Sequence, residues 1–298
     1  MLTIKPANAI LGATVTGVDL NQPLSAADFG GLLRALGQYG VLCFPNQLIE
    51  APALRDFSIN FGSLQMISRL ADANAPEVSI LSNVVENGDY IGTPDAGQDW
   101  HTDMTYNRVP GFVNVLVAHK VPMRDGKPLG GTAFTNTQAA YDDLPSDVKT
   151  RLTNATALHD HNQFQELMRS KGSTRPAQTE AQKRSRPPVS HPVFLTHPIS
   201  GRKVIYVNPG FTARINELSP EESDATLKML YAHVMQPKYA YTHHWSVGDV
   251  LLWDHLGTWH CALADYAPNE YRLMKRCQVM ADKVFDPAFL QEKLRVVA

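Results

Sequence analysis

The sequence predicts a mainly β protein with flanking helices, and three features of the pattern support this. Short apolar runs of strand length, punctuated by glycine and proline, occupy most of the chain. Helical patterns are fewer, and they come early in the chain or between strands. No internal repeat or linker interrupts the 298 residues, so residues 1–298 are expected to form one domain. Together these features favour an antiparallel sandwich or barrel with helical buttresses over a doubly wound sheet.

Four elements are expected in the first half of the chain. Residues 10–18 are typical of a strand. A helix is expected over 25–40, with a serine N-cap and a glycine stop. The apolar run VLCF at 41–44 follows as a strand that is buried on both faces. Residues 136–152 have a helical pattern in two pieces, because Pro145 would interrupt a single helix.

The clearest helix is expected over 219–235. Its first residues, Ser-Pro-Glu-Glu, supply an N-cap serine, a proline at the first helical position and a glutamate that closes a capping box. Further strands are expected over 113–121, 203–208, 240–245, 249–255 and 272–280. Residues 162–190 are polar, charged and interrupted by proline, so they are expected to form a long insertion of the kind that often serves as a lid.

Composition and charge exclude several classes of protein. The chain has 27 basic and 29 acidic residues and a formal net charge of −2, so neither a nucleic-acid partner nor a membrane partner is expected. No apolar run is long enough to span a bilayer, and the N-terminus lacks the pattern of a signal peptide. Cys43, Cys261 and Cys277 match no disulfide or zinc framework, which favours a cytoplasmic protein.

The stretch DWHTDMTY, residues 99–106, places His101 and Asp103 two residues apart, so a strand would point both side chains the same way. Among 11 histidines this spacing is weak evidence alone, and a strand-end pair at the surface would explain it equally well. His260, however, follows another apolar strand. Two imidazoles and one carboxylate can occupy one face of an octahedral metal and leave three positions open, as in non-heme Fe(II) oxygenases.

Two arginines and a glycine-rich turn add to this prediction. Arg272 and Arg276 are four residues apart in an expected strand, so they share a face, where buried cations would need anions. In such an oxygenase a 2-oxo acid chelates the metal, and Arg272, helped by the Thr132 hydroxyl, would bind its far carboxylate. The alternatives are a salt bridge from Arg272 to Asp265, a structural ion pair at Arg276 and an ordinary strand threonine.

Five other residues are candidates for contact with a substrate. Tyr106 follows the HxD motif, and Asn208 and Phe211 lie in VNPGF. His159 and His161 lie in LHDHNQF; their spacing also suits a strand metal site, but both are expected to line the pocket or to begin the lid. For Asn208 and Phe211 the alternative is core packing, and for Tyr106 it is a strand tyrosine whose hydroxyl is hydrogen-bonded.

The chain resembles the taurine and 2,4-dichlorophenoxyacetate dioxygenases, the TauD/TfdA family. The resemblance is carried by LGATVTGVDL, VLCFPNQ, WHTDMTY, GGTAF, AAYDDLP, THPISGRKVIYVNPGFTARI and GDVLLWDHLGTWHCALADYAPNEYRLMKR, in that order. It implies a double-stranded β-helix, a cupin-like jelly roll. It also implies Fe(II) as cofactor and 2-oxoglutarate and O₂ as co-substrates. The family positions that bind iron match His101, Asp103 and His260, and those that bind 2-oxoglutarate match Arg272 and Thr132.

By this resemblance the chain hydroxylates a C–H bond of a small organic anion and releases succinate and CO₂. A sulfonate, a sulfate ester, an aryloxy acid or another carboxylate would place its anion at Arg276. No histidine follows the turn at 61–64, which makes taurine itself a poor candidate. Two other functions fit the same ligands, a Zn-dependent hydrolase and a non-catalytic jelly-roll binding protein. The resemblance further implies a homo-oligomer, either a dimer or a tetramer.

Overall fold

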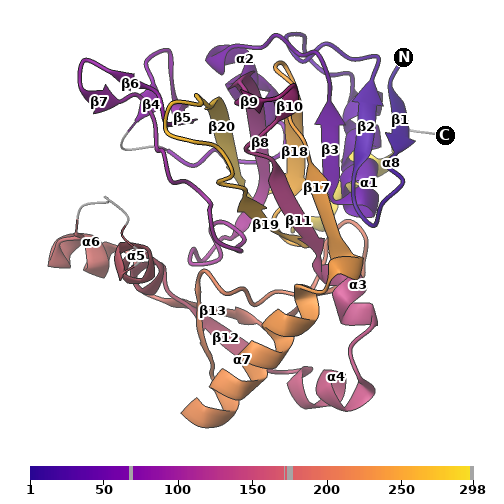
Figure 1. Cartoon of the computed structure of the whole chain (residues 1–298). Helices are drawn as coiled ribbons and strands as arrows, with labels where there is room; N and C mark the ends of the chain where they lie inside the picture. Colours follow the sequence, from indigo (N-terminus) through magenta and orange to yellow (C-terminus); the bar gives the residue numbers. More distant parts are fainter. Residues whose placement is uncertain (67–69, 171, 173–176, 296–298) are drawn as a thin grey trace.

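The computed structural model describes residues 1–66, 70–170, 172 and 177–295. Most of this chain is built on β-sheets, with helices on their outer faces and in the connections (Figure 1), as the sequence predicts. The largest sheet has eight strands, in the spatial order β1 (Thr3–Pro6), β2 (Ala13–Thr16), β3 (Val41–Phe44), β18 (Val250–Asp254), β8 (Gly111–Lys120), β20 (Leu273–Met280), β5 (Ala75–Ser82) and β4 (Ala71–Asp72).

A three-stranded sheet faces the large one. Its strands are, in spatial order, β17 (Ala240–His243), β11 (Thr132–Asn136) and β19 (Thr258–Ala262). Phe134 of β11 packs with Trp253 of β18 and Met274 of β20 in one buried cluster between the sheets. Leu252, next to Trp253, packs in a different cluster on the other face of the large sheet. This alternation is the expected consequence of side chains pointing to opposite faces of a strand.

Helices cover the outer face of the large sheet. They are α1 (Ala26–Tyr39), α2 (Ala51–Ser58) and α8 (Pro287–Arg295). The N-cap serine and the terminating glycine that the sequence predicts are confirmed at the two ends of α1. The side chain of Ser25 accepts a hydrogen bond from the amide of Asp28, and Gly40 ends the helix with a φ of 67°. The buried leucines of α1 pack with those of β3 and β18, so this helix and sheet share one core.

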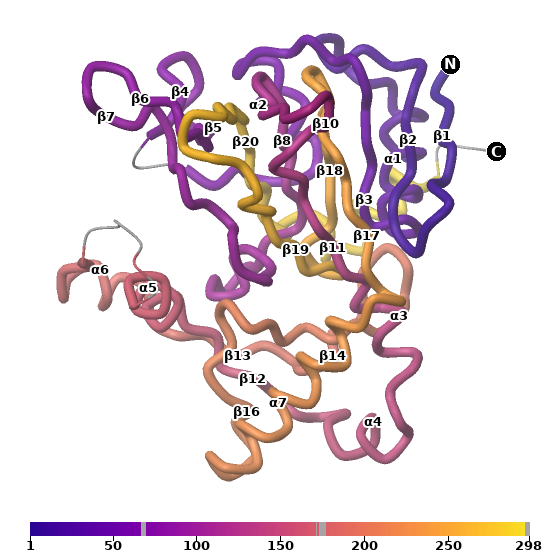
Figure 2. The backbone as a smooth tube through the Cα atoms, in the orientation of Figure 1, coloured from indigo at the N-terminus to yellow at the C-terminus, as the bar shows by residue number. Residues whose placement is uncertain are grey.

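A second group of elements packs at one end of the two facing sheets (Figure 2). It contains a sheet of β13 (Val189–Pro192), β12 (Thr156–His159) and β16 (Thr212–Ile215), the pair β14 (Phe194–Thr196) and β15 (Lys203–Ile205), and the helices α3 (Thr137–Asp142), α4 (Ser146–Leu152) and α7 (Pro220–Val234). The break between α3 and α4 falls at Pro145, and α7 has the predicted capping box from Ser219 to Glu222.

The remaining elements are short. They are the hairpins β6 (Val85–Glu86) with β7 (Asp89–Tyr90) and β9 (Met123–Arg124) with β10 (Lys127–Pro128), a 3₁₀ turn at Pro237–Tyr239, and the helices α5 (His161–Ser170) and α6 (Glu180–Ser185). The expected insertion at 162–190 therefore contains two helices and ends in β13, and its residues 171 and 173–176 lie outside the described residues. Within the described chain, every helix is too short or too polar to cross a membrane.

Candidate active site

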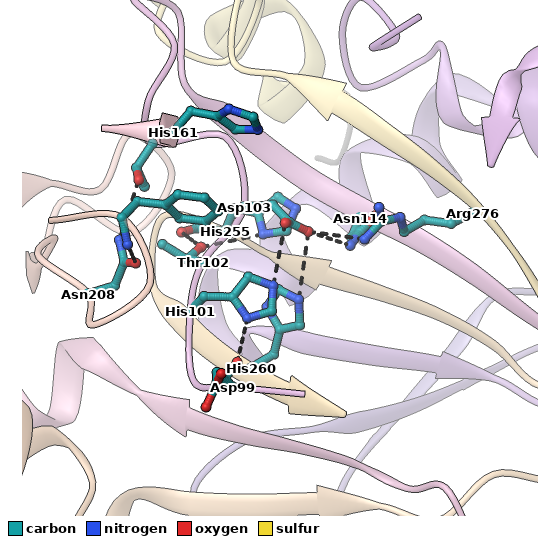
Figure 3. Close-up of polar contacts among 12 residues, drawn as sticks. Asp99, His101, Thr102, Asp103, Asn114, His161, Asn208, His255, His260 and Arg276 are labelled. Carbon is teal, nitrogen blue, oxygen red and sulfur yellow. Dashed lines mark hydrogen bonds and ion pairs between the residues drawn. The ribbon is translucent and has the colours of Figure 1, made fainter. Parts of the chain in front are cut away.

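The three predicted metal ligands meet between the two facing sheets. His260 lies on β19, and His101 joins it through a single antiparallel bridge with N–H···O distances of 3.1 and 2.8 Å. Extended pairing is limited to this bridge, because the chain turns at Asp103 and Met104 has a φ of 60°. The turn still points the Asp103 carboxylate at both imidazoles (Figure 3).

The donor atoms of this cluster are close enough to share one ion. Oδ1 of Asp103 lies 3.4 Å from Nε2 of His101, and Oδ2 lies 3.7 Å from Nε2 of His260. All donor atoms are within 4.8 Å of one another, and all three residues are buried. Nδ1 of His101 donates to the backbone oxygen of Asp99 at 2.7 Å, so Nε2 keeps the lone pair that a metal requires. The donor set therefore fits a divalent metal.

Electrostatics keep these ligands in the protonation states that bind metal. Burial raises the pKa of Asp103, but the Arg276 guanidinium and the two histidines outweigh it and hold that pKa well below its ordinary value. Burial, together with His101, holds the pKa of His260 well below its ordinary value. At neutral pH the site thus presents a carboxylate and, at His260, a neutral imidazole, the forms in which these groups ligate metals.

A small cavity of about 30 Å³ adjoins the cluster and is bordered by His260, Thr132, Arg272 and Arg276. Arg272 is only 6% exposed, and its Nε has no hydrogen-bond partner among the described residues. Burial lowers its pKa, and within the described chain no carboxylate forms an ion pair with it. Asp265, the alternative partner, accepts a hydrogen bond from the Gly130 amide at 2.7 Å instead. A buried guanidinium in this state fits the carboxylate of a ligand.

Thr132 lies beside this guanidinium on β11 and is 3% exposed. Its Oγ1 accepts a hydrogen bond from the indole Nε1 of Trp245 at 3.0 Å. That contact uses a lone pair and leaves the hydroxyl hydrogen available for an acceptor. Thr132 can therefore donate to a carboxylate held by Arg272.

Replacing Gly130 with alanine is expected to weaken ligand binding at Arg272. Gly130 has a φ of 66°, and a Cβ there would lie 3.1 Å from Cδ of Arg272 and 3.1 Å from the ring of Tyr266. Gly126→Ala is the matched control, because its φ is 74° and nothing lies within 4 Å of the added atom. Both variants should lose about 1 kcal/mol of stability, but only Gly130→Ala should raise the Kd for 2-oxoglutarate in calorimetry. Equal Kd values would mean that Gly130 does not position Arg272.

A larger pocket of about 750 Å³ opens next to the metal ligands. Three of the predicted substrate contacts, Arg276, Tyr106 and Phe211, line this pocket, and Nη1 of Arg276 lies 3.3 Å from Oδ2 of Asp103. Burial raises the pKa of Tyr106 to about 12, so its hydroxyl stays protonated. Three residues of α5 also line this pocket: His161, which the sequence offers with His159 as a pocket or lid residue, and Phe164 and Gln165, which the sequence did not identify.

Two predicted substrate contacts lie elsewhere. His159 is fully buried in β12, where its ring packs against His191 and Tyr206, outside the residues that line the pocket. Its prediction as a substrate contact is therefore wrong, because the strand turns its side chain into the core. Asn208 is also fully buried, and its Oδ1 accepts from the amide of Phe211 at 3.0 Å. Asn208 shapes the loop that presents Phe211 and does not itself line the pocket.

A second group of metal-capable side chains, Cys43, His243 and Asp249, lies near β3 and β18. Nε2 of His243 lies 3.1 Å from Oδ2 of Asp249, and that oxygen also accepts from the amide of Ser246. Burial raises the pKa of the Cys43 thiol to about 12. The histidine and carboxylate thus satisfy each other, and the thiol is protonated, so this group needs no metal.

Comparison with known proteins places this site in a family. The model of the "Taurine catabolism dioxygenase TauD, TfdA family" matches residues 3–278. Pentalenolactone F synthase of Streptomyces avermitilis is 30% identical, over 96% of each chain. The alpha-ketoglutarate-dependent 2,4-dichlorophenoxyacetate dioxygenase of Cupriavidus pinatubonensis is 28% identical, over 94% of this chain and 98% of its own.

A solved structure agrees with this assignment. AAD-2, crystallised with Mn(II) and N-oxalylglycine, superposes with a TM-score of 0.78 at 26% identity, over 95% of this chain and 98% of its own. The family match covers nearly all of the chain, and the site has the donor set and the buried arginine that the family motifs imply. The chain therefore belongs to the TauD/TfdA family and is a 2-oxoglutarate-dependent dioxygenase.

Proposed function

We propose that His101, Asp103 and His260 hold Fe(II) and that Arg272 and Thr132 bind the far carboxylate of 2-oxoglutarate. The observation that carries this is the buried Arg272 guanidinium, which has no carboxylate partner among the described residues and borders the same cavity as His260. A zinc hydrolase built on the same ligands would leave this cation without a role. A binding protein that had lost its chemistry would be expected to lack a metal ligand, whereas all three ligands are present. The large sheet facing the three-stranded sheet supports a double-stranded β-helix, formed by residues 1–298 as one domain.

When bound, Fe(II) with 2-oxoglutarate and O₂ supplies the oxidant for a substrate C–H bond, and succinate and CO₂ are released. His101, Asp103 and His260 would hold the ion, and Arg272 with Thr132 would hold the far carboxylate of the co-substrate. Aromatic side chains form part of the wall of the adjoining pocket, chiefly Tyr106, Phe164 and Phe211, and these would shield a bound substrate from water. Because Phe164 lies on α5, this helix would act as the closing element of the 162–190 insertion.

The substrate we propose is a small organic anion with an apolar, preferably aromatic, body. Among the described residues that line the pocket, Arg276 supplies the positive charge, and the aromatic side chains of the same wall suit a ring. The 2,4-dichlorophenoxyacetate dioxygenase among the relatives acts on such an acid. Aryloxy acids and other carboxylates are therefore our first candidates, with sulfonates and sulfate esters next. Taurine has no such body, and no histidine follows the turn at 61–64.

An anaerobic absorption spectrum tests the proposed assignment of the ligands. Adding Fe(II) and then 2-oxoglutarate to the metal-free protein should produce the weak visible charge-transfer band of the chelate. Candidate anions that enter the pocket should shift that band, which turns the measurement into a substrate screen. Absence of the band with Fe(II) and 2-oxoglutarate both in excess would contradict the assignment and favour the zinc alternative.

The charge of the substrate should decide its KM. For a carboxylate substrate found by the screen, its uncharged primary amide should have a KM at least roughly 30-fold higher, since loss of a buried charged partner costs about 2 kcal/mol or more. In Arg276→Gln this difference should shrink severalfold, whereas Lys275→Gln, on the other face of β20, should keep it. Equal KM values for acid and amide in the wild-type enzyme would refute the anion site at Arg276.

A further inference from the structure

Asn114 is a polar residue in the middle of an otherwise apolar strand. It lies on β8, in GFVNVLVAHK, and is fully buried. Its backbone pairs with Trp253 of β18 on one side and with Gln278 of β20 on the other, so two neighbouring strands of the large sheet fix its position. Burying an amide costs free energy unless its polar atoms are bonded. A buried amide at this position therefore calls for a partner nearby.

That partner is the predicted metal ligand Asp103. Nδ2 of Asn114 donates to Oδ2 of Asp103 at 3.3 Å, and Nη1 of Arg276 approaches the same oxygen at 3.3 Å (Figure 3). The other polar atom of the amide, Oδ1, has no partner among the described residues. The side-chain amide of Asn114 is thus hydrogen-bonded only through its nitrogen, and that hydrogen bond goes to Oδ2 of Asp103.

The two donors on this oxygen differ in what else they can do. Arg276 lines both the small cavity and the larger pocket, and its side chain is 18% exposed, so a substrate anion can reach it. Asn114 is inaccessible and held by two neighbouring strands. An anion that competes for the guanidinium would not reach the amide of Asn114.

We propose that Asn114 is a positioning residue that fixes the Asp103 carboxylate through Oδ2, so that Oδ1 faces the metal and Arg276 is free to bind the substrate anion. This rests on the proposed role of Asp103 as a ligand. Hydrogen bonds to metal-binding carboxylates orient them, and their loss typically lowers metal affinity by about 10–100-fold. Asn114 does this with a neutral donor, which leaves the charge of the ligand unchanged.

The test is Asn114→Leu, which has a similar volume and removes both the donor and the unpartnered Oδ1. The variant should unfold at the wild-type temperature or above, since an incompletely bonded buried amide is replaced by an apolar side chain. Its Kd for Mn(II), measured by calorimetry on the metal-free protein, should rise by about 10–100-fold. A merely structural role would change the unfolding temperature and leave the Kd unchanged. Asn114→Ala, which also lacks the donor, should show the same rise if leucine does not fit.

The matched control is Thr137→Val in α3. The Thr137 hydroxyl is also buried and without a partner among the described residues, and its removal should leave the Kd for Mn(II) unchanged. If both Asn114 variants bind Mn(II) as tightly as the wild type, the positioning role is refuted and the proposed ligand set stands. If the wild type itself does not bind Mn(II) or Fe(II), the ligand set is refuted, and the role of Asn114 with it.

Discussion

Replacing His101 with alanine is expected to abolish 2-oxoglutarate turnover while the fold is retained. Nε2 of His101 is one of three buried donor atoms that lie within 4.8 Å of one another. Without it two protein ligands remain, and the loss of metal affinity should exceed the roughly 10–100-fold that follows from removing a hydrogen-bond partner of a ligand. Succinate formation and the Kd for Fe(II) would both be measured, the latter anaerobically.

His159→Ala is the control for this variant, because it also removes a fully buried imidazole from the neighbourhood of the pocket wall. Burial lowers the pKa of His159 to about 3, so it is neutral, and its ring packs in the core outside the pocket lining. The control should lose stability and keep its Kd for Fe(II). Full turnover by His101→Ala would rule out the ligand assignment, whereas loss of metal binding by both variants would point to a general loss of structure.

The chemistry of the site could be predicted from the sequence because it depends on residue types at short spacings. An HxD pair, a distal histidine and two arginines on one strand face suffice to suggest the metal and its co-substrate. Asn114 could not be found this way. It contacts Asp103 only because β8 lies between β18 and β20 in the large sheet, and strand order is not encoded by any local pattern.

The elements with strong local signals were predicted well. The capping box at Ser219, the left-handed Gly40 and the break at Pro145 each depend on a few adjacent residues, and all three were confirmed. The 162–190 segment was predicted as a loop because it is polar, yet α5 forms there. Phe164 and Met168 are four residues apart, so they lie on one face of α5, and both pack against Phe211. This tertiary contact stabilises a helix that the polar composition of the segment does not predict.

The two histidines at 159 and 161 illustrate the same limit. Their spacing predicts a shared face only if the strand continues through both residues. The structure ends β12 at His159 and begins α5 at His161, so the first points into the core and the second into the pocket. A change of element between two residues reverses such a prediction, and element boundaries depend on tertiary packing.

Arg272→Met is expected to weaken the binding of 2-oxoglutarate strongly and, at the same time, to stabilise the protein without its ligands. Arg272 is 6% exposed, and its guanidinium lacks a carboxylate partner in the described chain, so burying this charge costs free energy in the ligand-free state. A methionine fills similar space without charge and should be neutral or stabilising, by up to about 1–4 kcal/mol. The lost charge pair should raise the Kd for 2-oxoglutarate by roughly 30-fold or more.

Thermal unfolding with and without 2-oxoglutarate, in the presence of Mn(II), separates the two effects, because a ligand that binds the native state raises the unfolding temperature. The wild type should gain stability with 2-oxoglutarate, and Arg272→Met should unfold at a higher temperature without it and gain much less at the same 2-oxoglutarate concentration. Lys275→Met is the control. The Lys275 ammonium pairs with Glu50 and Asp72 on the outer face of the large sheet, so its removal should leave the stabilisation by 2-oxoglutarate intact. Strong destabilisation of the ligand-free Arg272→Met protein would mean that the guanidinium has a structural partner. An unchanged Kd for 2-oxoglutarate would mean that Arg272 does not bind the co-substrate.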